Sequence, residues 1–188
     1  SVGTKILPGL IGTFRAEWPG VEIALRESRD CAELIHAVET GDIDVTFIDI
    51  GPYETGSLRV RRLLDDPMVL VAPADAPEAE RRTVSIDDVA HLPMIGTRSP
   101  GCRQIIDDAL RQAAVLPTYV FRSDDNPTIQ GLIGSGLAYA VLPLLTVDEN
   151  DPHVAVIPIR PAPPPRRLGI AWHPERRPPV ALLPFVEA

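Results

Sequence analysis

The stretch CAELIHAVETGDIDVTFIDI, Cys31–Ile50, decides the fold class because it predicts a helix followed directly by a strand. Apolar residues at positions 31, 34, 35 and 38 recur with the spacing of one helical face. Gly41 follows them, and glycine commonly ends a helix because it adopts the left-handed conformation without strain. The run Ile43–Ile50 is rich in β-branched residues and predicts a strand.

The same alternation of helix and strand continues along the chain and restarts after Pro73. We expect Ser85 to cap a short helix, and Asn126-Pro127 to serve as the N-cap and first residue of another. This β-α-β order predicts a parallel sheet with flanking helices. The expected helices span 7–18, 31–40, 85–89, 101–114, 128–136 and a last one from 180, and the expected strands span 21–27, 43–50, 68–73, 93–97, 118–123, 137–143, 153–159 and 168–173.

The repeat of this pattern predicts two similar α/β lobes. We expect lobe I to comprise 1–72 and 169–188, and lobe II to comprise 73–168. Two lobes joined by two crossover strands form a cleft, and clefts between lobes are the usual binding places for small molecules.

Composition limits the classes of protein to which the chain can belong. Of its 188 residues, 45% are hydrophobic and 23% are charged, which suffices for a folded core. The net charge of −8 argues against binding to a nucleic-acid backbone by this chain alone. Two cysteines without a C-x-x-C motif argue against a disulfide scaffold or a zinc ribbon, so we expect a cytoplasmic protein with no metal and no cofactor. The longest apolar run, GLAYAVLPLL, is too short to span a membrane.

Three segments carry a combination of motifs in a fixed order. The first, LPGLIGTFRAEWPGVEIAL, has Leu-Pro at its start, then Phe14 and Pro19 before an expected strand. The second, LIHAVETGDIDVTFID, contains Val38-x-x-Gly41-x-x-Asp44, and the third, IQGLIGSGLAYAVLP, contains a glycine and apolar run from 136 to 143. Each piece has a structural explanation, such as a helix end at Gly41, so the motifs indicate the fold and not the ligand.

Together these motifs resemble the effector-binding domain of LysR-type transcriptional regulators over essentially the whole chain, although Ala138 stands where the family's last motif has glycine. The resemblance implies two Rossmann-like lobes joined by two crossover strands, a type 2 periplasmic-binding-protein-like fold. It also implies a small-molecule effector, a homodimer or homotetramer, and DNA binding through an N-terminal winged helix-turn-helix that is absent from this chain, as is the first strand of lobe I. A periplasmic-type solute-binding protein has the same two-lobed plan and is the alternative.

Four turns between an expected strand and an expected helix are the candidate effector site, because free N–H groups and the helix dipole attract anions there. The resemblance implies that hydroxyl groups of the first three turns contact the effector, which we expect to be anionic. Arg29, Arg98 and Arg103 could neutralise its carboxylate. For each hydroxyl the alternative is a simple helix cap. The candidate residues are Ser1 and Thr4; Ser28, Asp30 and Cys31; Thr97, Arg98, Ser99, Gly101 and Cys102; and Asn126.

The segment Thr97–Gly101 nearly spells G-x-S-x-G, the turn that presents a catalytic serine. Thr97 replaces its first glycine, and Pro100 has no N–H to serve as an oxyanion-hole donor. Neither His153 nor His173 has an acidic partner at an obvious position. We therefore expect no catalytic residues and no enzymatic activity.

Cys102 suggests a second alternative, a thiol-based redox sensor. An expected helix N-terminus and the flanking arginines would favour its thiolate. Peroxide-sensing LysR-type regulators carry a reactive cysteine in this neighbourhood and a resolving cysteine about nine residues later, where this chain has Arg111. Cys31 is the only other thiol, so we favour a small residue that lines the pocket over a redox centre.

Overall fold

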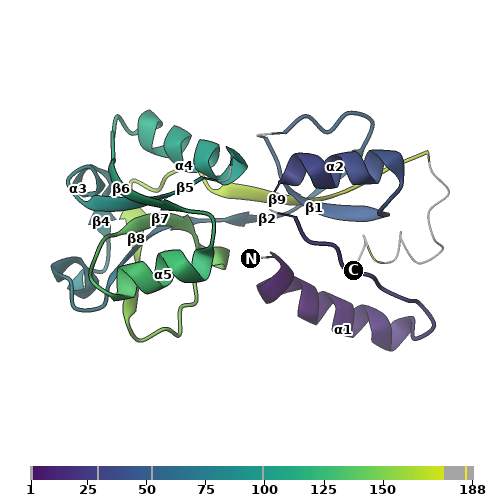
Figure 1. The fold of residues 1–188 in the computed structure, drawn as a ribbon, viewed down its shortest axis with the longest axis horizontal. Coiled ribbons are helices and arrows are strands. Elements are labelled where there is room, and N and C mark those ends of the chain that lie inside the picture. The colour runs from purple at the N-terminus through teal and green to yellow at the C-terminus, as the bar shows by residue number, and fades with distance from the viewer. Residues whose placement is uncertain (1, 29, 52, 99, 176–184, 186–188) are drawn as a thin grey trace. The chain divides into compact units, whose positions relative to one another are not determined.

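The computed structural model describes residues 2–28, 30–51, 53–98, 100–175 and 185 (Figure 1). The chain divides into two compact units, unit 1 (1–64 with 167–188) and unit 2 (65–166). The sequence placed the first change of lobe at residue 73. The change falls earlier because the strand Met68–Pro73 pairs on both sides with strands of unit 2.

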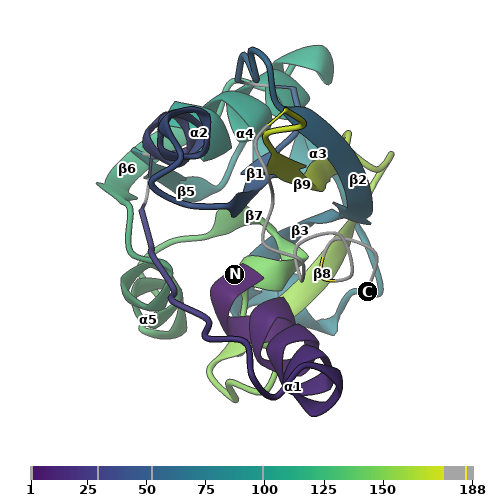
Figure 2. The same cartoon turned by 90° about the vertical axis from the view of Figure 1, so that its right-hand side faces the viewer.

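The described part of unit 1 contains a three-stranded sheet and the helices α1 and α2. A π-helical turn, Val2–Ile6, leads into the first helix. The helix α2 packs against β1 and β9 through a core of Ile35, Val38, Ile48, Leu58 and Ala171 (Figure 2). β1 and β9 are antiparallel, with Val45 opposite Trp172 and Asp49 opposite Leu168. The elements are α1 (Leu7–Glu17), α2 (Cys31–Thr40), and strands β1 (Val45–Asp49), β9 (Arg166–Trp172) and β2 (Arg59–Asp66) in the sheet order β1-β9-β2.

Unit 2 contains a four-stranded sheet in the order β4-β8-β3-β7 and a parallel pair, β5-β6. A bridge between Met94 and Tyr139 links β5 to the segment that precedes β7. The strands are β3 (Met68–Pro73), β4 (Val84–Ser85), β5 (Pro93–Thr97), β6 (Thr118–Ser123), β7 (Ala140–Pro143) and β8 (Val154–Arg160), and the helices are α3 (Ile86–Val89), α4 (Pro100–Gln112), α5 (Asn126–Gly134) and the 3-10 turns Pro77–Glu80 and Leu144–Thr146.

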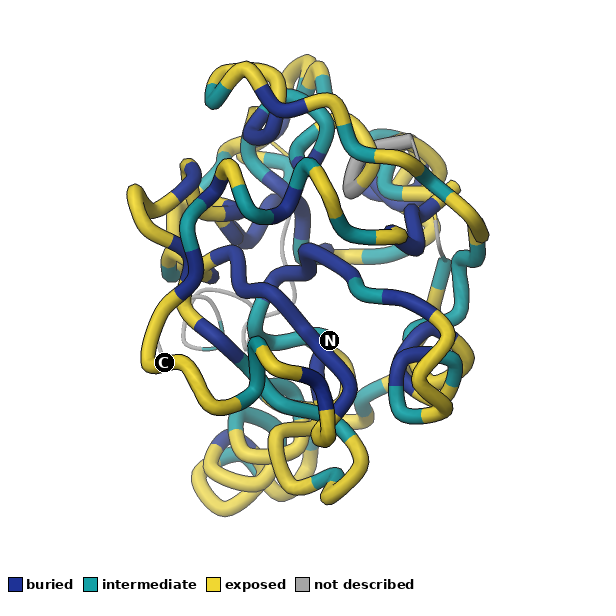
Figure 3. Tube along the Cα trace, turned by 90° about the vertical axis from the view of Figure 1, so that its left-hand side faces the viewer, coloured by how far each residue is buried: buried dark blue, intermediate teal, exposed yellow. Residues whose placement is uncertain are grey.

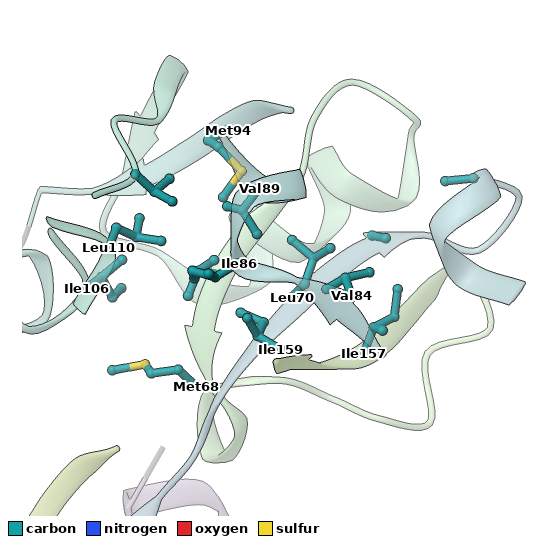
Figure 4. Packing of buried hydrophobic residues seen from close by; sticks show 14 residues of the cluster. Met68, Leu70, Val84, Ile86, Val89, Met94, Ile106, Leu110, Ile157 and Ile159 are labelled. Atoms are coloured by element: carbon teal, nitrogen blue, oxygen red, sulfur yellow. The ribbon is translucent and has the colours of Figure 1, made fainter. Parts of the chain in front are cut away.

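The strand β3 separates two hydrophobic cores within unit 2. Leu70 and its alternate neighbours face a core shared with α3 and α4, which contribute Ile86 and Leu110 (Figure 4). Val71 faces the other core, which α5 closes with Ile133. Because successive side chains of a strand point to opposite faces, β3 is buried along its whole length, as the sequence predicted. Figure 3 shows buried residues (dark blue) towards the middle of the trace and exposed residues (yellow) in its outer turns.

Helix ends in both units follow from local sequence. Gly41 ends α2 with φ 84°, and the Ser85 side chain begins α3 in a capping box, so both predictions are confirmed. The prediction that Asn126 is the N-cap of α5 is wrong by one residue. Asp125 is extended, and its carboxylate accepts the N–H of Thr128 at 3.1 Å, so Asp125 is the cap and Asn126 the first helical residue.

Three further expectations need correction. We expected parallel strand pairing, but the pairing in unit 2 is mixed. β3 pairs antiparallel with β7 and β8, while the pairs β4-β8 and β5-β6 are parallel. The expected strand 21–27 pairs with no described strand, and Leu25 is 63% exposed there. β2 was not predicted, since Arg59–Asp66 is mostly charged. The helix expected from Val180 lies outside the described residues, except for the helical Phe185.

Candidate functional site

The polar turn of unit 2 lies where β5 and β6 end side by side, with Thr97 paired to Ser123 (Figure 1). Asp124 follows β6 directly and reaches across to the end of β5. Its Oδ1 accepts the backbone N–H of Arg98 at 2.7 Å and the hydroxyl of Thr97 at 3.3 Å. Thr97 is buried, whereas the Arg98 side chain is exposed. A carboxylate of the protein therefore already occupies two donors of this turn.

Arg122 contacts the same turn at the backbone carbonyl of Thr97. Its Nη1 donates to the Thr97 carbonyl at 3.4 Å, and its guanidinium carbon lies 4.2 Å from the centre of the Tyr119 ring. A Cβ at Gly96 would lie 2.8 Å from that ring and 2.9 Å from the guanidinium, so glycine leaves the space for both. Burial raises the pKa of Tyr119, as does its hydrogen bond to Asp107 at 2.7 Å.

The polar turn of unit 1 precedes α2. Asp30 caps this helix by accepting the N–H of Ala32 at 2.9 Å, and Ser28 accepts the N–H of Asp30 at 3.1 Å. The Ser28 hydroxyl also donates to Glu33 at 2.7 Å, and Arg26 donates to the other oxygen of that carboxylate at 2.7 Å. These bonds lower the pKa of Glu33. Asp30 thus caps α2, and the Ser28 hydroxyl links the backbone of Asp30 to the Glu33 carboxylate.

Cys31 lies at the first position of α2 and is partly buried. Burial raises the pKa of its thiol above the ordinary value of a cysteine, and the carboxylate of Asp49 raises it further, while hydrogen bonds with the Asp49 backbone and Tyr53 lower it. Asp49 itself is buried at the end of β1. A thiol in this environment is protonated at neutral pH and is a poor nucleophile.

The remaining predicted residues fall in several places. Thr4 lies in the π-helical turn of unit 1, and Asn126 is half-buried in the first turn of α5. Ser1, Arg29 and Ser99 lie outside the described residues. Gly101 and Cys102 lie in the first turn of α4, which begins at Pro100, and the Cys102 side chain is not among the described ones. The structure brings Thr97 and Arg98 together in unit 2, and Ser28, Asp30 and Cys31 together in unit 1.

Asp124 and Asp49 were not predicted. A signal for Asp124 was present in the sequence, since this residue lies within the turn Ser123–Asn126 that was already a candidate. Two consecutive aspartates could both have been caps, and only the structure separates them: Asp125 caps α5 while Asp124 contacts β5. Asp49 was predicted only as part of a strand.

One serine and histidine pair in unit 1 has the residue types of a hydrolase active site. The Ser57 hydroxyl lies 3.3 Å from His173 Nε2, and the N–H of Glu175 donates to His173 Nδ1. A neutral imidazole that accepts at Nδ1 carries its proton at Nε2. His173 in that form donates to Ser57 and does not remove its proton, so this pair is not an activated nucleophile.

Within the described part of the chain, no three His, Cys, Asp or Glu side chains gather closely enough to hold a metal ion. Over the same residues, no helix has the length and apolar character needed to cross a membrane.

Comparison with known families identifies the class of this protein. The model of the LysR substrate binding domain matches residues 1–188. The chain therefore belongs to the family of LysR substrate-binding domains, and the resemblance inferred from its motifs is confirmed.

Related sequences are transcriptional regulators. The chain is 28% identical over 161 residues to the transcriptional dual regulator GltC of Bacillus subtilis (strain 168), covering 85% of this chain and 53% of GltC. It is 25% identical over 177 residues to the uncharacterized HTH-type transcriptional regulator YybE of the same strain, covering 92% of this chain and 58% of YybE. The chain thus spans about half the length of the curated relatives that it matches.

A solved structure confirms the fold. The C-terminal domain of a probable LysR family transcriptional regulator from Rhodococcus sp. RHA1 is similar with a TM-score of 0.87 and 26% identity, covering 99% of this chain and 92% of that domain. The type 2 periplasmic-binding-protein-like fold, predicted from the sequence, is the fold of such regulatory domains.

Proposed function

We propose that this chain is the ligand-sensing domain of a LysR-type transcription factor. In this proposal a small-molecule effector binds in the cleft between the two units. Binding favours one conformation over another and changes the arrangement of a dimer or tetramer. That change controls how a separate N-terminal helix-turn-helix domain binds DNA. The net charge of −8 is consistent with leaving DNA contacts to another domain.

The observation that carries the proposal, beyond family membership, is the polar turn at Thr97, Arg98 and Asp124. It presents a half-buried carboxylate that accepts the backbone N–H of Arg98, whose side chain is exposed, where a strand ends and a helix begins. Ligands of open α/β folds collect at such ends.

Two proteins of the same fold support a role in ligand binding. The CcmR regulatory domain of Synechocystis PCC6803 was solved in complex with 2-PG, and the effector binding domain of QuiR with shikimate. Their identities to this chain are 22% and 16%, with TM-scores of 0.83 and 0.86. We infer from them the size and polarity of an effector, and not its identity.

A thermal-shift screen of small carboxylates tests the proposal on the wild type and on Cys102→Ser. An effector should raise the melting temperature of the wild type, because binding to the folded state stabilises it by mass action. Cys102→Ser should still respond, because serine is close to cysteine in size. Hydrogen peroxide is the second arm and should shift neither. If peroxide shifts the wild type alone and no metabolite shifts either protein, the effector model is wrong and Cys102 is a redox sensor.

A further inference from the structure

Among the described residues, hydrogen-bond partners contact only one oxygen of the Asp124 carboxylate. Its Oδ1 serves Thr97 and Arg98, as described above, but its Oδ2 has no hydrogen bond to another described residue. The neighbouring Asp125 differs, because one oxygen of its carboxylate accepts both the N–H and the hydroxyl of Thr128, at 3.1 and 2.7 Å. Asp125 thus caps the helix, whereas Asp124 is half-exposed and no described residue donates a hydrogen bond to its Oδ2.

Two described donors of this turn, the Thr97 hydroxyl and the Arg98 N–H, already bind a carboxylate. An effector carboxylate placed on the Arg98 N–H and the Thr97 hydroxyl would have to displace Asp124, and would meet its negative charge at close range. A hydroxyl group meets no such penalty, because it can donate directly to the second oxygen of Asp124.

The residue whose backbone N–H Asp124 accepts is itself an arginine. The Arg98 guanidinium is exposed and makes no hydrogen bond or ion pair to another described residue. Arg122 lies at the other side of Thr97, stacked on Tyr119. Two guanidinium groups and one carboxylate favour a ligand that is anionic but brings a neutral donor to Asp124. They disfavour an ammonium group in the same place.

We propose that Asp124 is a specificity-determining residue that selects a hydroxylated acid, binding its hydroxyl through Oδ2 while Arg98 binds its carboxylate. This inference rests on the proposed function and narrows the expected anionic effector to a hydroxy acid.

Matched pairs of acids test the inference by calorimetric titration of the full chain. The pairs are malate with succinate, glycerate with propionate, and 3,4-dihydroxybenzoate with benzoate, which differ only in their hydroxyl groups. The wild type should bind the hydroxylated member of a pair about tenfold more tightly, the value of one hydrogen bond to a charged group. Aspartate, with an ammonium in place of the malate hydroxyl, should bind more weakly than malate.

Two variants separate Asp124 from a general effect of charge. Asp124→Asn keeps an acceptor for Thr97 and Arg98 but turns the second oxygen into a donor, so the preference should fall by about tenfold. Asp125→Asn removes the same charge one residue away, and Asn also caps helices, so the preference should persist.

The outcomes distinguish this inference from the proposed function. If the wild type binds acids without preferring the hydroxylated members, or if both variants lower the preference equally, Asp124 does not select the effector although effector binding stands. Tighter binding of aspartate than of malate also overturns the hydroxyl assignment. If the wild type binds no small acid at all, the proposed function fails and this inference fails with it.

Discussion

Replacing Asp66 by asparagine removes the charge from the most deeply buried ion pair of unit 2. The Asp66 and Arg166 side chains are 0% and 5% exposed, and their closest N–O distance is 2.6 Å. Asp66 Oδ2 also accepts from Arg166 Nε at 3.1 Å, and Oδ1 accepts the N–H of Leu145 at 3.0 Å. The pair therefore links Asp66 to Arg166 and to the turn after β7, all within unit 2.

The Asp66→Asn side chain can still accept from Leu145, but it leaves the Arg166 guanidinium without its buried carboxylate. Breaking a buried pair by neutralising one partner costs about 3–5 kcal/mol. We expect about 3 kcal/mol, the lower end, because Arg166 makes a further interaction. In a chain of this size, that loss lowers the melting temperature by roughly 10 °C.

Urea unfolding at neutral pH, followed by far-UV circular dichroism, measures this loss. Tryptophan fluorescence recorded alongside follows unit 1, because both tryptophans, Trp18 and Trp172, belong to it. The matched control is Asp108→Asn, which breaks an exposed pair with Arg111 and should cost less than about 1 kcal/mol.

A double variant, Asp66→Asn with Arg166→Met, removes both charges and should recover more than half of the stability lost in the single variant. A loss below about 1 kcal/mol in Asp66→Asn, or a double variant no more stable than the single one, would refute the reasoning.

Three other changes have outcomes set by local geometry. Gly41→Ala forces alanine into φ 84° and should cost about 1 kcal/mol in urea unfolding, whereas Gly131→Ala, in open space on α5, should be neutral or stabilise by up to about 1 kcal/mol; equal effects would refute the role of φ. Gly96→Ala should cost about 1–3 kcal/mol and weaken the near-ultraviolet signal of Tyr119, because its Cβ would lie 2.8 Å from that ring; an unchanged protein would show that the stack can shift freely. Burial and the hydrogen bond to Glu78 raise the pKa of Tyr139 to about 12, so the folded state holds this proton more tightly than the unfolded state. Its contribution to stability is therefore complete below about pH 10 and is lost as the pH rises towards 12. Tyr139→Phe should make the alkaline decline in melting temperature shallower, and a decline as steep as in the wild type would contradict this.

Local sequence predicted those elements whose ends and faces are set within a few residues. β6 at Thr118–Ser123 and the end of α2 at Gly41 needed no information from distant parts of the chain. β2 was missed because its eight residues are mostly charged, and it becomes a strand through pairing with β9, which lies far along the chain. The segment 21–27 was predicted as a strand and is not one. Its alternating pattern fits a strand, but a strand also needs a neighbour to which it can hydrogen-bond.

For the candidate site, the sequence predicted the positions of the turns but not the contacts between them. The turns at Thr97 and Asp30 could be located because strand and helix signals adjoin there. The contact of Asp124 with Arg98 across two strand ends could not be predicted, since it depends on the pairing of Thr97 with Ser123. The raised pKa of the Cys31 thiol could likewise not be predicted, because it depends on burial and on Asp49, which lies in a different element.

The most direct test of effector binding is an amide-resolved NMR titration of the full chain with the tightest-binding acid from the screen. We expect saturable shifts of the Thr97 and Arg98 amides in unit 2, together with those of Asp30 and Cys31 in unit 1, at one dissociation constant. Saturable shifts confined to one unit, or to residues away from both turns, would contradict an effector held between the two units.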